Sequence, residues 1–233
     1  MSVRPLAALV LVPFVLGAAG DPPAEPCPGD MVAVEGEYCT AVKQHCQSWM
    51  EPPGIAGDGR CAHFDPSECV GERKPMRFCI DRDEYTPAGQ TLPAGTLSWT
   101  DARKICTDAG KRLCLESEWN FACEGEQMVP YPTGLDRPST VCNFDQHHLL
   151  DHFGKPLDLR KPSSSLVDCV SPFGVRNMVG NIDEWVERDV TWGPHRSALK
   201  GGWWLAGRNR CRPATTAHDE IYRDFQTGLR CCR

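Results

Sequence analysis

Two histidines lie four residues apart in a polar segment of the chain, with aspartates beside them. His148 and His152 would face the same side of a helix, and imidazole is a common ligand of zinc and iron. Asp145 and Asp151 could add carboxylate oxygens. Two histidines do not complete a metal site, so a polar surface segment is the alternative interpretation.

Fourteen cysteines are the other residues suited to chemistry, and the N-terminus indicates what surrounds them. Residues 1–20 combine Arg4 with an apolar run over residues 6–16 and small residues at 17–20, which is typical of a secretory signal peptide. The run is interrupted by Pro13 and is too short to span a membrane, for which about 20 apolar residues are needed. We therefore expect a secreted or periplasmic protein whose mature chain has no membrane span and whose cysteines form disulfides.

The charge pattern argues against one class of partner. The formal net charge is -6, with basic and acidic residues interspersed and no basic stripe to attract nucleic acid. We expect no nucleic-acid partner and a monomer.

The periodicity predicts few helices. Residues 98–110 and 116–125 have helical patterns, and the first opens with Ser98 or Thr100 as a capping residue and ends at Gly110. Elsewhere short apolar pieces alternate with turn residues, which predicts short strands and many loops. The sequence thus predicts a compact, irregular, disulfide-braced α+β fold. Its expected segments are a signal peptide (1–20), a proline-rich lead-in (21–30) and one domain (31–233) with a Cys-rich insertion at about 40–76.

Four sequence blocks occur in an order that resembles a known family. They are AGKRLCLESEWNFACEG (109–125), NMVGNIDEWVERD (177–189), LKGGWW (199–204) and TGLRC (227–231). They are similar to blocks of the formylglycine-generating enzyme, or sulfatase-modifying factor, family. Weaker similarity at residues 31–39, 78–86 and 131–134 extends the match over nearly all of the mature chain outside residues 40–76. The resemblance implies an α+β domain distantly related to C-type lectins.

The resemblance also implies two disulfides. Cys106 and Cys123 stand at the family's positions around the AGKRL block, and the family's pairing joins Cys106 to Cys231 and Cys123 to Cys211. Use of Cys232 in place of Cys231 stays open.

Calcium is the cofactor that the resemblance implies. The family's ligands correspond to a side-chain oxygen of Asn177, the backbone carbonyls of Gly180 and Ile182, and the carboxylate of Glu184, a donor set that suits this hard cation. Alternatively, Asn177 and Glu184 only brace a turn. A second family site would use, at shorter spacing than in the family, Asn143, Phe144, Asp151 and Phe153.

The catalytic position of the family differs in this chain. The family's enzymes hold Cu(I) between two cysteine thiolates, which are soft ligands. Here Ala206 stands at the first position, and Cys211 coincides with the second but equally fits the structural partner of Cys123. Copper is therefore not expected. Four cysteines remain after these assignments: Cys114, Cys142, Cys169 and Cys232. We expect them to form two further disulfides, and a relocated copper pair among them is the alternative.

Two functions remain as hypotheses. The first is a binding or accessory module that holds an unknown peptide or small ligand in a groove lined by Trp203, Trp204 and Arg208, with Trp192 nearby. Paired tryptophans are also typical of a core, so the groove is one of two interpretations. The second hypothesis is an oxidoreductase of the formylglycine-generating or pyoverdine-maturation type.

Overall fold

The computed structural model describes residues 26–52, 54, 59–189 and 193–233. The signal peptide predicted for residues 1–20, the first half of the proline-rich lead-in (21–25) and Trp192 lie outside the described residues. No helix in the described part of the chain is long and apolar enough to cross a membrane.

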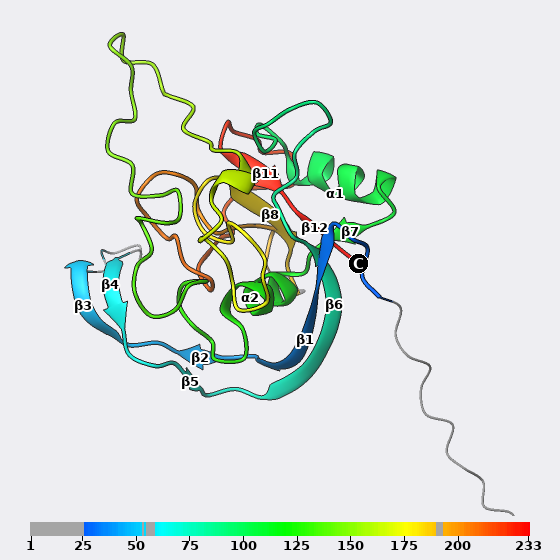
Figure 1. The fold of residues 1–233 in the computed structure, drawn as a ribbon, viewed down its shortest axis with the longest axis vertical. Helices are drawn as coiled ribbons and strands as arrows, with labels where there is room; N and C mark the ends of the chain where they lie inside the picture. Colours follow the sequence, from blue (N-terminus) through cyan, green and yellow to red (C-terminus); the bar gives the residue numbers. More distant parts are fainter. Residues whose placement is uncertain (1–25, 53, 55–58, 190–192) are drawn as a thin grey trace, which may run out of the picture.

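The described chain has many short strands and few helices (Figure 1). In chain order the elements are β1 (Met31–Cys39), β2 (Val42–Lys43), β3 (Cys46–Glu51), β4 (Arg60–Phe64), β5 (Glu68–Cys69), β6 (Arg73–Asp81), α1 (Trp99–Asp108), β7 (Arg112–Leu113), α2 (Glu116–Glu124), a 3-10 turn (Ser163–Ser165), β8 (Asp183–Glu187), β9 (Ser197–Lys200), β10 (Ala214–Thr215), β11 (Thr227–Leu229) and β12 (Cys231–Cys232). This composition confirms the predicted α+β class.

Two four-stranded sheets form the body of the molecule. The first has the order β1-β6-β12-β7, with β1 and β6 antiparallel over nine residue pairs from Met31↔Asp81 to Cys39↔Arg73. Strand β12 lies between β6 and β7, so the last strand closes a sheet that the first one opens. The second sheet has the order β10-β9-β8-β11, in which β8 and β11 are parallel.

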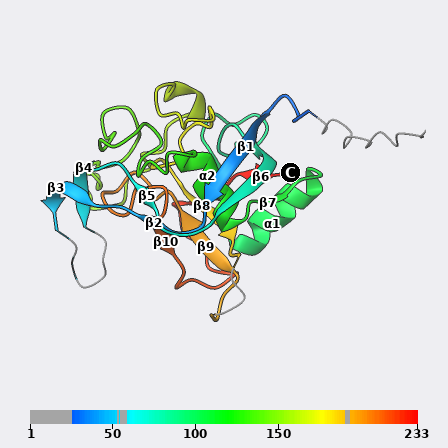
Figure 2. The same cartoon turned by 90° about the horizontal axis from the view of Figure 1, so that it is seen from below.

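The Cys-rich insertion extends away from this body. Two small antiparallel pairs, β2 with β5 and β3 with β4, carry it to one end of the molecule (Figure 2). Disulfides Cys39–Cys69 and Cys46–Cys61 cross-link it. Its inner end packs on the body through the rings of Phe64 and Tyr131, whose centroids are 5.8 Å apart. These two disulfides and this aromatic contact thus stabilise the Cys-rich insertion, which is too short to form a large apolar core of its own.

Both predicted helices are present. Helix α1 begins after Ser98, whose hydroxyl accepts a hydrogen bond from the Asp101 backbone while the Asp101 carboxylate accepts one from the Ser98 backbone. This capping box fixes the start that the sequence predicts. Helix α2 is buried over most of its length and lies at the centre of Figure 1. Its Trp119 is 0% exposed, which makes α2 the core element on which both sheets pack.

All fourteen cysteines are paired in seven disulfides. Cys106 is joined to Cys231, and Cys123 to Cys211. The four remaining cysteines form the bonds Cys114–Cys232 and Cys142–Cys169, and Cys27–Cys79 ties the lead-in to β6. Such dense cross-linking is that of a chain folded in an oxidising, extracellular or luminal environment.

Candidate functional site

The loop that follows β9 encloses a cavity of about 600 Å³ against the end of the second sheet. Gly201 and Gly202 turn the chain with φ of 83° and 72°, which favours glycine. A Cβ atom on Gly202 would lie 2.5 Å from the Asn209 amide nitrogen, so no larger residue fits there. The cavity wall includes Trp203, Ala206 and Arg208 from this loop.

An ion pair forms the polar part of the wall. The Arg208 guanidinium donates through Nη2 to the Asp183 carboxylate and through Nε to Thr215 Oγ1 at 2.6 Å. The Gly202 N–H donates to the same carboxylate at 3.0 Å. Burial raises the pKa of Asp183, while Arg208 and the Gly202 N–H act in the opposite direction. Among the described residues of this wall, Arg208 and Asp183 therefore neutralise each other.

Three polar atoms of the same wall have no hydrogen-bond partner among the described residues. They are one donor, Nη1 of Arg208, and two acceptors, Oδ1 of Asn209 and Oε1 of Gln226, and all three are buried. A buried polar atom without a partner destabilises a protein by about 1–3 kcal/mol. Neither Asn209 nor Gln226 was singled out from the sequence, because nothing in their local pattern shows that the fold brings them to Arg208.

The predicted groove residues divide between wall and core. Trp203 is half-buried and lines the cavity, whereas Trp204 is 1% exposed and packs beneath it. Their rings lie 4.9 Å apart, and the Phe225 ring lies 5.2 Å from that of Trp203. Trp204 therefore supports the wall from the core rather than contributing to its surface.

The copper position contains no thiolate. Ala206 lines the cavity, and the Cys211 sulfur is bonded to that of Cys123 in the core. No free cysteine exists elsewhere in the described chain, so no relocated pair is present either. The residues at this position do not fit a two-coordinate Cu(I) ion.

The side chains predicted to bind calcium have other partners in the core. Glu184 accepts from Arg230 Nη2 at 2.6 Å, from Arg230 Nε at 2.7 Å and from Trp119 Nε1 at 2.7 Å. Arg230 thereby neutralises the Glu184 carboxylate, whose negative charge a bound calcium ion would need. The Gly180 carbonyl, two residues before Ile182, accepts from the Ile182 N–H at 2.7 Å.

Asn177 is the predicted ligand that keeps an oxygen without a partner. Its Oδ1 is buried and unpaired among the described residues, while its Nδ2 donates to Glu84 at 3.2 Å and to the Ser163 carbonyl at 3.1 Å. The pairing of Glu184 with Arg230 favours the alternative in which the two residues brace a turn, whereas the unpartnered oxygen of Asn177 is what a calcium ligand requires. Calcium binding here stays a prediction.

Glu84 is a buried carboxylate to which the sequence reasoning assigned no role. It is 2% exposed and accepts from Ser163 Oγ at 2.6 Å, from Asn177 and from Asn181. Burial first, and then the nearby Glu184 carboxylate, raise the pKa of Glu84 to about 8. Its place in the FCIDRDEYT block was the one signal in the sequence.

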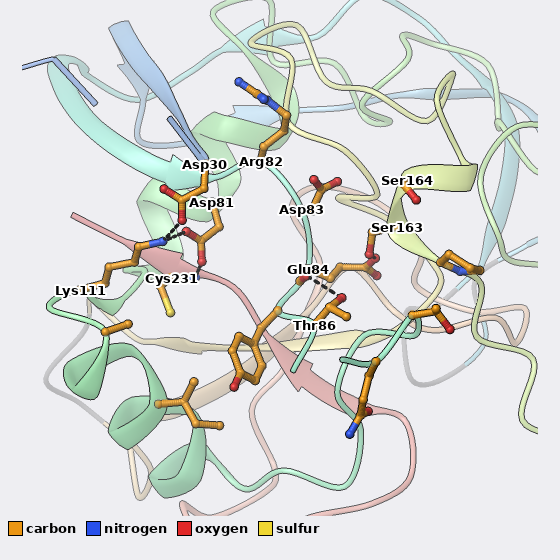
Figure 3. Close-up of a pocket in the computed structure, with 16 residues that line it drawn as sticks. Asp30, Asp81, Arg82, Asp83, Glu84, Thr86, Lys111, Ser163, Ser164 and Cys231 are labelled. Atoms are coloured by element: carbon orange, nitrogen blue, oxygen red, sulfur yellow. Dashed lines mark hydrogen bonds and ion pairs between the residues drawn. The ribbon is translucent and has the colours of Figure 1, made fainter. Parts of the chain in front are cut away.

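Glu84 also lines a second cavity, of about 900 Å³ (Figure 3). On the opposite side of this cavity the Lys111 ammonium bridges Asp30 at 2.5 Å and Asp81 at 2.6 Å. Asp83 is paired with Arg176, which leaves Glu84 as the acidic side chain of this cavity without an ion pair among the described residues. Hydrogen bonds from the core amides satisfy Glu84 instead, so the cluster has the character of a structural network.

The residues of the second predicted calcium set have other hydrogen-bond partners, and calcium binding there stays a prediction. Asn143 and Phe144 are buried, but the chain doubles back between Leu149 and Leu157, and Asp151 closes that turn by accepting from the backbone of Phe153. The Phe153 side chain is 75% exposed. The Asn143 side chain donates instead to the Leu159 carbonyl at 2.8 Å and to Asn181 Oδ1 at 2.9 Å.

The histidine pair, His148 and His152, lies at the same turn between Leu149 and Leu157 and just before it. His148 and His152 are exposed and belong to a loop, so the helical geometry that a shared metal would need is absent. Asp145 is bound by Arg137 in two hydrogen bonds of 2.7 Å. No group of three or more histidine, cysteine or acidic residues in the described chain could hold a metal ion. The helix-based metal hypothesis is wrong, and the segment is a polar surface loop.

Comparison with known proteins agrees with this fold. A family model described as sulfatase-modifying factor enzyme 1-like domain matches residues 35–233. The formylglycine-generating enzyme of Mus musculus is 33% identical over 103 residues, which cover 40% of this chain and 26% of that protein. The inactive C-alpha-formylglycine-generating enzyme 2 of Bos taurus is 30% identical over 103 residues, covering 40% and 32%. The chain thus matches about a third or less of the length of these relatives.

Two solved structures share the fold at low sequence identity. CarF has a TM-score of 0.56 at 16% identity, covering 88% of this chain and 98% of that one. PvdO from Pseudomonas aeruginosa has a TM-score of 0.56 at 16% identity, covering 87% and 93%. Because the family model spans most of the chain and the fold agrees with it, the protein belongs to the sulfatase-modifying factor enzyme 1-like, or formylglycine-generating enzyme-like, family.

Proposed function

We propose that this chain is an exported binding or accessory module of its family, without copper-cysteine oxidase activity. The observation that carries the proposal is the pair of residues at the copper position: Ala206 has no sulfur, and the Cys211 sulfur is committed to Cys123. Thiolates hold Cu(I), and neither is available here. The existence of a relative named as inactive supports a family that retains the domain without the oxidase reaction.

The cavity beside Ala206 is the proposed ligand site. It combines the half-buried indole of Trp203 with the guanidinium of Arg208, and small ligands bind in such concave sites through an apolar wall and a few oriented polar groups. A peptide or a small molecule of similar chemistry would fit its volume of about 600 Å³. Export through the N-terminal signal peptide would expose this site to ligands outside the cytoplasm.

An oxidase assay tests the proposal. Purified protein is incubated with Cu(I), oxygen and a peptide containing Cys-x-Pro-x-Arg, and aldehyde is measured by mass spectrometry. We expect no aldehyde, either from the natural chain or from Ala206→Cys, because Cys211 stays in its disulfide. An active formylglycine-generating enzyme is the positive control. Aldehyde formation by the natural chain would establish the oxidoreductase alternative.

Export is tested separately. The full chain is expressed in a secreting host, and the N-terminus of the mature protein is sequenced. We expect cleavage close to residue 20. Retention of Met1 on the secreted protein would contradict the signal peptide.

A further inference from the structure

The unpartnered polar atoms of the cavity beside Ala206 define the chemistry of what could bind there. Nη1 of Arg208 requires an acceptor, and Oδ1 of Asn209 and Oε1 of Gln226 require donors. All three residues line the same cavity. A ligand group with a hydrogen-bond acceptor next to a hydrogen-bond donor would satisfy Nη1 of Arg208 and at least one of the two oxygens together.

The charge of the cavity argues against an anionic ligand. Arg208 is the cation of the wall, but Asp183 already neutralises it, and the Asp183 carboxylate also accepts from the Gly202 N–H. A carboxylate or phosphate can only accept hydrogen bonds unless it is protonated. It would leave the Asn209 and Gln226 oxygens unpaired and would face them with its own negative charge. An ammonium group can only donate hydrogen bonds, so it would leave Nη1 of Arg208 without an acceptor and would repel the guanidinium.

A neutral secondary amide meets each requirement. Its carbonyl oxygen accepts from Arg208, its N–H donates to Gln226 or Asn209, and its flanking carbon contacts the apolar part of the wall, which includes Trp203 and Ala206. The geometry points to a ligand that presents a neutral secondary amide, such as an acylated amine, as the group bound in this cavity. This inference rests on the proposed binding function and specifies its ligand class.

Binding requires a side-chain rearrangement. The three unpartnered atoms are buried, and Asn209 is 1% exposed, with its Nδ2 held by the Trp203 carbonyl at 2.8 Å. Arg208 is held by Asp183 and Thr215, so a small shift of its free Nη1 and a turn of the partly exposed Gln226 side chain are the movements that retain the ion pair. The expected signature is therefore a change at the Arg208 and Gln226 side-chain N–H groups.

Small probes that differ in one function test the ligand chemistry. ¹⁵N-labelled full mature chain is titrated with N-methylacetamide, with methyl acetate, which lacks the N–H, and with acetate, which is anionic. We expect N-methylacetamide to shift the side-chain signals of Arg208 and Gln226 and the backbone signal of Gly202. Methyl acetate should bind roughly tenfold more weakly, because it leaves a buried acceptor unpaired. Acetate should leave these signals unchanged.

A variant separates the binding group from a general change of the protein. Gln226→Met retains the length of the side chain and removes its acceptor, so the preference for N-methylacetamide over methyl acetate should fall at least threefold. Gln90→Met, the same substitution at an exposed residue outside this cavity, should retain the full preference. Equal preference in Gln226→Met and the natural chain would overturn the assignment of Gln226.

Two larger probes then identify the source of the amide. N-acetylglycine N-methylamide represents a peptide and N-acetylglucosamine an acetamido sugar, and the tighter of the two at the same signals names the source. Acetate binding as tightly as N-methylacetamide, or no shift of cavity signals by any amide, would overturn the inference. Acetate binding would still leave the proposed binding function in place, whereas aldehyde formation in the oxidase assay would overturn that function independently.

Discussion

Lys200 is a lysine with no exposure to solvent, and its burial should make the stability of the protein depend on pH. It lies on β9, where its Nζ donates to the Arg212 carbonyl at 2.6 Å and sits 5.3 Å from the centre of the Trp119 ring. The nearest carboxylate oxygen, from Glu116, is 3.8 Å away. Burial lowers the pKa of Lys200 from 10.5 to about 7, and the charges of Arg208 and Arg212 act in the same direction, so the Glu116 and Glu124 carboxylates do not offset the loss of water.

The sign of the effect follows from where the proton binds. Between pH 7 and pH 10.5 the unfolded chain retains a proton on Lys200 that the folded chain has released. The free energy of unfolding therefore rises with pH across this range. With the folded pKa at about 7, the contribution of this residue grows by about 1.4 kcal/mol between pH 6 and pH 8.

The substitution Lys200→Met isolates this contribution. Methionine fills a similar volume without a charge, so the difference in free energy of unfolding between the natural chain and Lys200→Met should change by about 1.4 kcal/mol from pH 6 to pH 8. Guanidinium denaturation with the disulfides intact measures it at each pH. Lys104→Met, on the exposed face of α1, should show no such change. A constant difference for Lys200→Met would refute the argument that the buried ammonium titrates near neutral pH.

Three further predictions concern the core and its cross-links. The pKa of Glu84 is raised to about 8, so the folded chain retains a proton that the unfolded chain releases above the ordinary pKa of 4.5. The free energy of unfolding of the natural chain, compared with that of Glu84→Gln, should therefore fall by about 2 kcal/mol from pH 6 to pH 8. Denaturation with EDTA present measures this difference. Replacing both cysteines of Cys142–Cys169 by alanine should destabilise the protein by about 3.5 kcal/mol, because that bond closes a loop of 27 residues. Replacing those of Cys114–Cys232 should cost only about 2.7 kcal/mol, because the intact Cys106–Cys231 bond already joins the same two segments and leaves a loop of about ten residues to close. A larger loss for Cys114–Cys232 in urea denaturation would contradict the loop-length argument. The predicted calcium site requires a higher melting temperature in millimolar calcium than in EDTA, and Asn177→Ala should abolish the rise; an unchanged melting temperature would contradict the site and favour the alternative in which Glu184 is only paired with Arg230.

Sequence features that act locally anticipated much of the fold. The start of α1 at Ser98 depends on residues within one helical turn, and the family's cysteine spacing placed Cys106 and Cys123 on two helices. Both kinds of feature can be identified without knowing how distant segments meet.

Apart from the two disulfides that the family resemblance implied, features that depend on distant segments could not be anticipated. Glu84 meets Asn181 across 97 positions, and Asp183 meets Arg208 across 25. The turn near Asp151 reverses the chain and brings the Leu159 carbonyl to Asn143, a contact across 16 positions that no local pattern indicates. Lys200 resembles any charged residue in the sequence, and only the packing of β9 shows that water is excluded from it.

The position of β12 between β6 and β7 sets an order on biogenesis. Because translation proceeds from the N-terminus, β1 and β6 can pair as a hairpin while the ribosome is still making the helices. The first sheet and the α1 cross-link, by contrast, cannot close until residues 231 and 232 have been made. The neighbouring Cys231 and Cys232 then pair with Cys106 and Cys114, respectively. If the two partners were exchanged at this step, a mispaired isomer would form. Disulfide isomerase activity in the receiving compartment, rather than the rate of synthesis, should therefore limit the yield of native protein.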